Sequence, residues 1–560
     1  MTITHPGNPS DLSRSAPPRT LIFSALLTAF GLSGAALGND NCRIETIQGF
    51  APADTRITLA APTPEPVPHC RIEGTITTTN PGPNAVNFRL QLPDEGWTGR
   101  YFFIGLGGSA GYVPSDSQVP AGNPLLGGFA VAGTDTGRQG HMLDWDFVGE
   151  SEAKALDHRD RGAHVTNVAA QKITKDYYGV DSMYRYMSGC SGGGRMSTEA
   201  IERHPEDFDG VVLGAPGDWT TILSFIYNAQ QMTREPGAWL SPAKLAMMEA
   251  KVTAHCDALD GARDGLIWDE RACSYDFDQL KCEGGDGPEC LTAPELKSVK
   301  AVLTGPIGPD GKPLRPGWPI SNMTAWSGFL GPVPPPWSPE ASMENLRKSS
   351  GGYVIASTMA NVYMRPGIDV LKEIDLTNQA HLDAWVAGQQ KVQFGLPFSG
   401  DLNRYKANGG KVILWNGVSD PCCLDTKMKE YYDLVTEKVG GVTQVDDFAK
   451  YYRIPGMAHC GGGTGPQDAP DQMIRAMIDW VENGKSPEKI VAHRGAERTR
   501  LMFADPETGQ VSGVLIPPPQ GVPHDFTLCP YPQVPTFDQA KAHIEGAVHE
   551  AENWHCKNPG

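Results

Sequence analysis

The chain has 560 residues, a formal net charge of −18, and 40% hydrophobic against 20% charged residues. This composition is that of a globular protein rather than a disordered one. The acidic balance, with no run of Lys and Arg to reverse it locally, excludes nucleic acid and anionic membranes as partners. The length exceeds that of one simple core, so we expect two domains or one domain with a large insertion.

The first residues, 1–38, have the pattern of a signal peptide. Two arginines precede an apolar run at 21–32 that is too short to span a bilayer comfortably. The small residues that follow suit cleavage after Ala36 or Gly38; the alternative is a buried N-terminal helix. No later segment approaches a membrane span, so we expect a secreted or periplasmic protein in an oxidising compartment.

Short apolar runs bounded by glycines or turns have the character of buried parallel strands. Helical periodicity lies between some of them, at 162–178 and at 193–203. This alternation predicts an α/β fold with a mainly parallel sheet. The strand-like runs are 101–104, 129–132, 184–187, 210–213, 412–415 and 451–454.

The strand pattern stops after Gly217 and resumes only near Lys411. Loops rich in Trp, Pro and Cys, with some helical segments, fill the interval. Because the candidate catalytic residues described next lie on both sides of it, we interpret 218–400 as an inserted lid domain. The α/β core then consists of 39–217 and 401–560, and an independent second domain is the alternative.

Residues 189–193, Gly-Cys-Ser-Gly-Gly, fit the Gly-x-Ser-x-Gly nucleophile elbow, in which a serine is exposed on a sharp strand-to-helix turn. A serine nucleophile needs a base and an acid that orients the base. In α/β-hydrolases the order along the chain is serine, acid, histidine. Ser191, Asp420 and His459 fit that order, and both partners follow predicted strands. The alternatives are a Gly-rich turn, a turn-forming Asp before Pro421, and a structural loop histidine.

A cysteine adjoins each of two candidate catalytic residues: Cys190 precedes Ser191 and Cys460 follows His459. A disulfide holds its two Cα atoms within about 7 Å. A bond between Cys190 and Cys460 would therefore bring the candidate nucleophile and base together.

The 12 cysteines of an exported chain indicate a disulfide framework. Cys422 and Cys423 are adjacent and left over; they form a vicinal disulfide, stay as thiols, or alter the pairing scheme, and the sequence leaves this open. Spacing alone does not fix connectivity. The pairs proposed from proximity along the chain are Cys42 with Cys70, Cys256 with Cys273, Cys282 with Cys290, and Cys529 with Cys556.

Acyl transfer also needs donors for an oxyanion. The backbone N–H of Gly192, directly after the nucleophile, is expected to be one of them. The other is expected in the loop 105–111, which follows an early predicted strand. There Gly107 or Gly108 would let an amide approach the carbonyl closely. A plain Gly-rich loop is the alternative.

A second candidate site lies in 256–267, where Asp257, Asp260 and Asp264 fall within eight residues and two Asp-Gly turn signals occur. Such hard oxygen ligands suit Ca²⁺. The spacing is not that of an EF-hand loop, and a solvated acidic turn explains the same residues equally well.

Three motifs resemble those of the tannase and feruloyl esterase family, which also includes mono(2-hydroxyethyl) terephthalate hydrolase. They are the nucleophile segment 189–195, the acid loop 417–420 and the histidine loop 456–460. The resemblance extends over nearly all of the chain beyond residue 38. It implies an α/β-hydrolase core with a large inserted lid domain, and it implies that Cys190 and Cys460 are bonded.

The resemblance also implies structural Ca²⁺ in the lid, and no organic cofactor. Two features depart from the family pattern: Gly192 stands where Thr or a larger residue is common, and the Cys422–Cys423 pair is foreign to it. No lid arginine aligns with a carboxylate-binding one, although Arg347 and Arg365 are present. The implied Ca²⁺ ligands are the side chains of Asp257, Asp260 and Asp264 and the carbonyls of Ala262 and Leu266.

The function that follows from this resemblance is hydrolysis of small aromatic esters, such as feruloyl or galloyl esters, by a secreted serine esterase through an acyl-enzyme. One alternative is a hydrolase of other aromatic monoesters, such as mono(2-hydroxyethyl) terephthalate. The other is a calcium-dependent binding module with an inactive site. The sequence leaves the oligomeric state open.

Overall fold

The computed structural model of the chain describes residues 41–114, 124–495 and 522–559. The predicted signal peptide, 1–38, lies outside the described residues. No helix within these ranges has the length and apolar character that crossing a bilayer requires.

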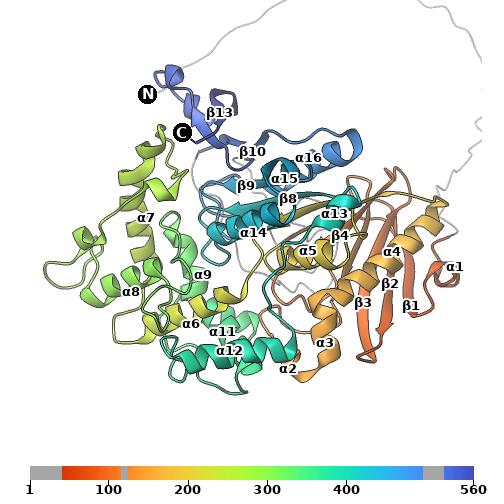
Figure 1. Cartoon of the computed structure of the whole chain (residues 1–560), viewed down its shortest axis with the longest axis horizontal. Helices are drawn as coiled ribbons and strands as arrows, with labels where there is room; N and C mark the ends of the chain where they lie inside the picture. The colour runs from red at the N-terminus through yellow and green to blue at the C-terminus, as the bar shows by residue number, and fades with distance from the viewer. Residues whose placement is uncertain (1–40, 115–123, 496–521, 560) are drawn as a thin grey trace, which may run out of the picture. The chain divides into compact units, whose positions relative to one another are not determined.

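A nine-stranded sheet forms the centre of the fold, in the order β1-β2-β3-β5-β4-β6-β7-β8-β9 (Figure 1). The first three strands and β5 pair antiparallel, and every pair from β5 to β9 is parallel. The predicted strands correspond to β4–β9, which confirms the α/β-hydrolase fold class. The strands are β1 (Thr55–Thr63), β2 (His69–Thr78), β3 (Asn84–Pro93), β4 (Arg100–Gly105), β5 (Ala130–Thr134), β6 (Tyr184–Cys190), β7 (Gly210–Gly214), β8 (Lys411–Gly417) and β9 (Ala449–Ile454).

Apolar side chains alternate along the parallel strands, so that a core forms on each face of the sheet. In β4, Phe102 and Ile104 belong to one core, and Tyr101 and Phe103 belong to the other. Three helices cover the second core and α16 covers part of the first. The three on the second core are α4 (Gly162–Tyr178), α5 (Gly192–Arg203) and α14 (Asp425–Lys438), and α16 spans Ala469–Asn483.

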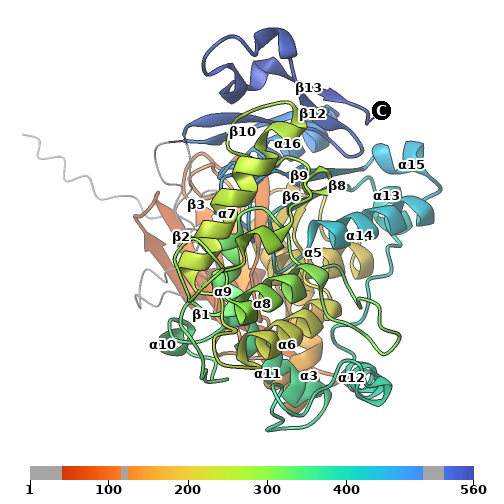
Figure 2. The ribbon, with the colours of Figure 1, turned by 90° about the vertical axis from the view of Figure 1, so that its left-hand side faces the viewer.

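Between β7 and β8 the chain leaves the sheet and forms a helical insertion, residues 215–410, with no strand in it. Figure 2 shows α6, α7 and α8 of this insertion facing the viewer, and α11 packs on α6. Residues Asn39–Gly560 form one compact unit. The insertion holds α6 (Trp219–Thr233), α7 (Pro242–Cys256), α8 (Ala293–Thr304), α9 (Ser327–Leu330), α10 (Met343–Leu346), α11 (Gly351–Tyr363), α12 (Gln379–Val392) and α13 (Asn403–Ala407).

Two small antiparallel sheets near the C-terminus lie beyond what the sequence predicted. One pairs β10 (Ile490–Arg494) with β11 (His524–Leu528), and the other pairs β12 (Val534–Phe537) with β13 (Trp554–Lys557). The remaining helices are α1 (Ile44–Phe50), α2 (Phe147–Glu150), α3 (Glu152–Leu156), the π-helical turn η2 (Asp157–Arg161) and α15 (Val442–Asp446).

Five disulfides are present, and they confirm every proposed pair. Cys422 and Cys423 are free and buried, so of the three possibilities left open the structure has thiols. The disulfides are Cys42–Cys70, Cys190–Cys460, Cys256–Cys273, Cys282–Cys290 and Cys529–Cys556.

Candidate active site

Ser191 occupies the sharp turn between β6 and α5. Its backbone has φ 62° and ψ −120°, a conformation that non-glycine residues adopt only where the surrounding structure imposes it. The turn is tight, because a Cβ at Gly189 would lie 2.5 Å from the carbonyl oxygen of Gly193. The two glycines of the motif therefore let the start of the helix pack against the end of the strand, and the serine is held at the apex.

Asp420 is fully buried in the turn after β8 and is held by the backbone that follows it. Its Oδ1 accepts hydrogen bonds from the amides of Cys422 and Cys423, at 2.8 and 3.0 Å. Its Oδ2 lies 2.8 Å from Nδ1 of His459, in the loop after β9. The carboxylate thus fixes the orientation of the imidazole and leaves Nε2 as the nitrogen available for proton transfer.

The electrostatics of His459 follow from this contact. Burial acts to lower the pKa of the imidazole, but the adjacent Asp420 carboxylate outweighs it, and with Cys423 raises the pKa to about 9 from an ordinary 6.5. The hydrogen bond between the two sulfur atoms, in which the Cys423 S–H donates to Cys422, and burial hold the pKa of the Cys423 thiol well above its usual value. Asp420 is the dominant cause that raises the pKa of His459.

The Cys190–Cys460 disulfide joins the end of β6 to the loop after β9, with 5.9 Å between the two Cα atoms. It brings Ser191 and His459 to the wall of one pocket. The Ser191 hydroxyl makes no hydrogen bond to His459 or to any other described residue. Hydrogen bonds of this kind commonly tighten only when substrate binds.

Gly192 packs directly against the loop that was expected to supply the second oxyanion donor. A Cβ at Gly192 would lie 2.1 Å from the carbonyl oxygen of Gly108, and a Cβ at Gly108, where φ is +57°, would lie 2.3 Å from the carbonyl oxygen of Met142. This contact gives a physical reason for the glycine at 192 in place of a larger residue. Among the described residues, no acceptor takes the N–H of Gly192, Gly107 or Gly108, and all three residues line the pocket.

The pocket has a volume of about 570 Å³ and lies between the sheet and the helical insertion. Arg347 lines it, whereas Arg365 is paired with Glu373 and does not. Phe329 presents an edge to the ring of His459, with 5.8 Å between the ring centroids. Six aromatic side chains from separate segments line the pocket: Trp145, Phe225, Phe329, Tyr363, Phe394 and Phe398.

The three predicted metal-binding carboxylates lie in the loop after α7, within the insertion. Burial, against the effect of backbone hydrogen bonds, raises the pKa of Asp260 to about 7, and the neighbouring Asp257 and Asp264 add to this shift. Burial likewise raises the pKa of Asp264 to about 6. Asp264 is buried, and Asp257 and Asp260 are half-buried. Carboxylates that repel one another in such surroundings are the donor chemistry that a hard divalent cation relieves. Their oxygens bond to backbone amides of the same loop, such as Gly265 N–H to Asp257 Oδ1 at 2.8 Å.

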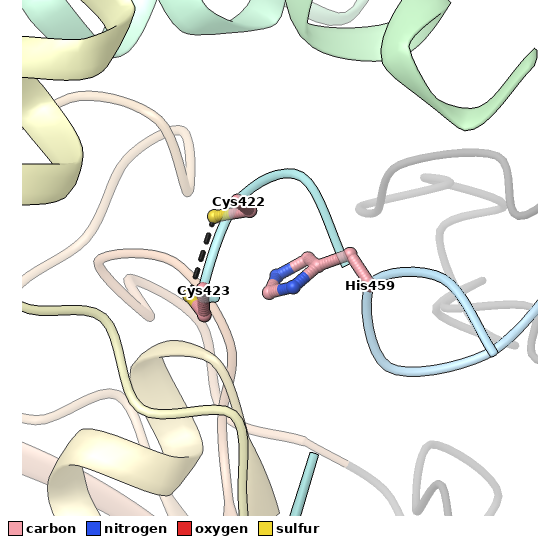
Figure 3. Close-up of side chains that lie close together, drawn as sticks. All are labelled: Cys422, Cys423 and His459. Carbon is pink, nitrogen blue, oxygen red and sulfur yellow. Dashed lines mark hydrogen bonds between the residues drawn. The ribbon is translucent and has the colours of Figure 1, made fainter. Parts of the chain in front are cut away.

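The sequence motifs did not show that Cys422 and Cys423 lie beside the imidazole of His459. Figure 3 shows the ring directed toward both cysteine side chains, whose sulfur atoms are 3.3 Å apart. The only feature of the sequence that pointed to this proximity was the position of Cys422 and Cys423 directly after the acid loop. The aromatic wall of the pocket left no such signal, because its members come from separate helices and loops.

Comparison with protein families matches residues 70–557 to the family described as tannase and feruloyl esterase. Feruloyl esterase C of Talaromyces stipitatus is 30% identical over 448 residues, which cover 76% of this chain and 78% of that protein. Feruloyl esterase B of Aspergillus niger is 27% identical over 475 residues, which cover 80% of this chain and 84% of that protein.

Two solved structures share the fold. Feruloyl esterase B from Aspergillus oryzae has a TM-score of 0.72 and 23% identity, covering 93% of this chain and 100% of that one. Tannin acyl hydrolase from Aspergillus niger has a TM-score of 0.69 and 17% identity, covering 92% and 95%.

Proposed function

Because this chain belongs to the tannase and feruloyl esterase family, and is thus a carboxylic ester hydrolase, we propose that Ser191, His459 and Asp420 form its catalytic triad. The contact of 2.8 Å between Asp420 and His459, at the wall of a pocket that also holds the strained Ser191, carries the proposal. Family membership favours this function over a binding module with an inactive site.

In the proposed mechanism, Ser191 Oγ attacks the ester carbonyl while His459 takes its proton. Asp420 holds the imidazole tautomer and stabilises the imidazolium. The N–H of Gly192, with that of Gly107 or Gly108, stabilises the tetrahedral oxyanion. His459 then gives its proton to the departing alcohol, and an acyl-enzyme remains. Water, deprotonated by His459, attacks the acyl carbon; the bond to Ser191 Oγ breaks, His459 returns the proton to that oxygen, and the acid is released.

The aromatic residues in the wall of the pocket support the substrate class that we propose. A cavity of about 570 Å³ lined by aromatic side chains suits a planar aromatic acyl group. Esters of phenolic acids, such as feruloyl and galloyl esters, are the substrates we propose.

A second candidate is an aromatic monoester with a free carboxylate, such as mono(2-hydroxyethyl) terephthalate. It is favoured by one observation, the position of the exposed Arg347 at the wall of the pocket. A guanidinium there would pair with the distal carboxylate of such a substrate.

We also propose that Ca²⁺ binds in the insertion. Asp257, Asp260 and Asp264 would hold it through their side chains, and Ala262 and Leu266 through their carbonyls. In the described structure the three side chains do not bring one oxygen each within 4.8 Å of the others, so they would turn inward around the ion. Ca²⁺ would offset the repulsion among these three carboxylates and so stabilise the loop.

We further propose that the protein acts outside the cytoplasm, secreted or in the periplasm, because disulfides such as the five present here persist in oxidising compartments.

A substrate panel tests the proposed function. Methyl ferulate, methyl gallate, chlorogenate and mono(2-hydroxyethyl) terephthalate are compared by kcat/KM, for the parent protein and for Ser191→Ala and Arg347→Gln. We expect the phenolic esters to be preferred and Ser191→Ala to lose all turnover. Retained turnover in Ser191→Ala contradicts the triad. A preference for the terephthalate ester that Arg347→Gln removes supports the second candidate instead.

A further inference from the structure

Two thiols and an imidazole meet at the wall of the proposed active site (Figure 3). One ligand atom each from Cys422, Cys423 and His459 lies within 4.8 Å of the other two. In the described part of the chain this is the one group of three or more His, Cys, Asp or Glu side chains that meets this criterion. The proposed mechanism uses the imidazole and leaves both thiols without a role.

The donor set is that of a thiophilic metal site. Thiolates and imidazole together suit Zn²⁺ and similar cations, and two Cys with one His and an open fourth position is a known zinc arrangement. Tetrahedral Zn²⁺ with its usual bond lengths would place these ligand atoms about 3.5–3.8 Å apart. The two sulfur atoms are 3.3 Å apart, and the imidazole nitrogen lies within 4.8 Å of both, so side-chain rotations would bring the three atoms to these separations.

The three ligand residues are preorganised, and a cation can reach them from the pocket. Asp420 holds the amides of Cys422 and Cys423, which fixes the backbone from which both thiols project. All three ligand residues line the pocket of about 570 Å³. A cation could enter by the route that substrate takes, and its fourth position would face the pocket.

We propose that Cys422, Cys423 and His459 form a binding site for a thiophilic divalent cation, Zn²⁺ being the physiological example, and that its occupancy blocks ester hydrolysis. Binding is not a redox step: each thiol releases its proton to solvent and both sulfurs donate to the metal. A metal on Nε2 takes the lone pair that should accept the Ser191 proton, and a metal on Nδ1 displaces Asp420. Only the inhibition rests on the proposed function; the binding does not.

Affinity should rise with pH, since the thiols must lose their protons.

The first arm of the test titrates the full chain with Cd²⁺ and monitors binding by the ultraviolet absorption of the Cd–thiolate bond. We expect one Cd²⁺ per chain in the parent protein and in Ser191→Ala, which keeps all three ligands. Loss of an outer partner of a metal ligand already costs about 10- to 100-fold in affinity. Cys422→Ser/Cys423→Ser, which loses two ligands, should therefore bind more than about 100-fold more weakly. The single variants Cys422→Ser and Cys423→Ser serve where the double variant does not fold.

The second arm measures inhibition with Ca²⁺ present throughout. Saturating Zn²⁺ should lower esterase activity by about 100-fold or more, since it removes the general base. A zinc-selective pyridyl chelator should restore the activity. The esterase rate of the double variant in Zn²⁺ should stay close to the rate of the same variant without metal.

Two outcomes overturn the proposal: no Cd–thiolate absorption in the parent protein, or mass spectrometry showing Cys422 bonded to Cys423. Absorption retained at full strength in the double variant does the same. If Ser191→Ala keeps its esterase activity but binds Cd²⁺, the triad fails and the metal site stands.

Discussion

Cys190 and Cys460 are separated by 270 residues in sequence, yet their disulfide holds their Cα atoms 5.9 Å apart, one directly before Ser191 and the other directly after His459. The bond ties the proposed nucleophile on the β6 turn to the proposed base on the loop after β9. In the described part of the chain, Ser191 and His459 are not joined by a hydrogen bond, so the disulfide is the link between these two positions.

Replacing both cysteines, Cys190→Ala/Cys460→Ala, should lower kcat/KM by about 100-fold, because a displacement of about 1 Å at a reacting group costs that much. Stability should fall by about 2–5 kcal/mol. Steady-state kinetics and urea unfolding measure the two effects. Cys282→Ala/Cys290→Ala, in the insertion, is the matched control, expected to keep kcat/KM. Unchanged turnover in the folded Cys190/Cys460 variant contradicts the positioning role.

The pH profile of kcat/KM reports on His459. Only the neutral imidazole can accept the Ser191 proton, and the Asp420 carboxylate, against burial, raises its pKa to about 9. We therefore expect activity to rise with pH through the alkaline range. Asp420→Asn should move the rise to lower pH and lower the rate by about 10⁴-fold. A plateau already reached below pH 6.5 in the parent protein contradicts this reading.

The raised pKa of His459 also makes stability depend on pH, but stability falls with rising pH where activity rises. Folding raises the pKa of His459, so the pairing of imidazolium with Asp420 contributes its full stabilisation below about pH 6.5. This contribution is lost as the pH rises through about 9. Urea unfolding of the parent and of Asp420→Asn across this range should give curves that converge at alkaline pH, and parallel curves contradict the coupling.

Gly192→Ala tests the proposed oxyanion hole. The added Cβ meets the Gly108 carbonyl oxygen, 2.1 Å away, so the loop that carries the second donor must shift. Since loss of one donor costs about 10²–10³ in kcat, we expect a fall of that order with a smaller change in KM. Gly49→Ala, where the new Cβ has nothing within 4 Å, is the control. Equal kcat in both variants would contradict a donor in the loop of Gly107 and Gly108.

Ca²⁺ should stabilise the protein and change its pH dependence. Ca²⁺ at about 100 times its Kd should add about 2.7 kcal/mol, and Asp260→Asn should abolish the gain. Without the ion, burial raises the pKa of Asp260 to about 7. The contribution of Asp260 to the free energy of unfolding should then be fully present below about pH 4 and be lost as the pH rises through about 7. Thermal unfolding with Ca²⁺ and with EGTA measures both effects, and equal curves contradict a calcium site.

The parallel strands β4–β9 could be predicted from sequence because they are buried on both faces and appear as continuous apolar runs. β1–β3 were not predicted, because they lack such continuous apolar runs. In β2, for example, buried residues such as Ile72 and Ile76 alternate with Arg71 and Glu73, which are partly exposed. Antiparallel strands with one solvated face have this alternating pattern.

The candidate site divides in the same way. Ser191, Asp420 and His459 each follow a predicted strand, so chain order and local motif identify them. The wall of the pocket does not follow from sequence, because Trp145, Phe329 and other residues meet only once the insertion has folded over the sheet. The proximity of Cys422 and Cys423 to the imidazole likewise requires the turn that wraps the amides of both residues around Asp420.

The central claim, that Ser191 is a nucleophile activated by His459, is tested most directly by labelling with a fluorophosphonate ester and locating the label by mass spectrometry. A single adduct on Ser191 in the parent protein, absent from Ser191→Ala and much slower to form in His459→Ala, is the result we predict. A parent protein that takes up no label, or takes it up on another serine, contradicts the account.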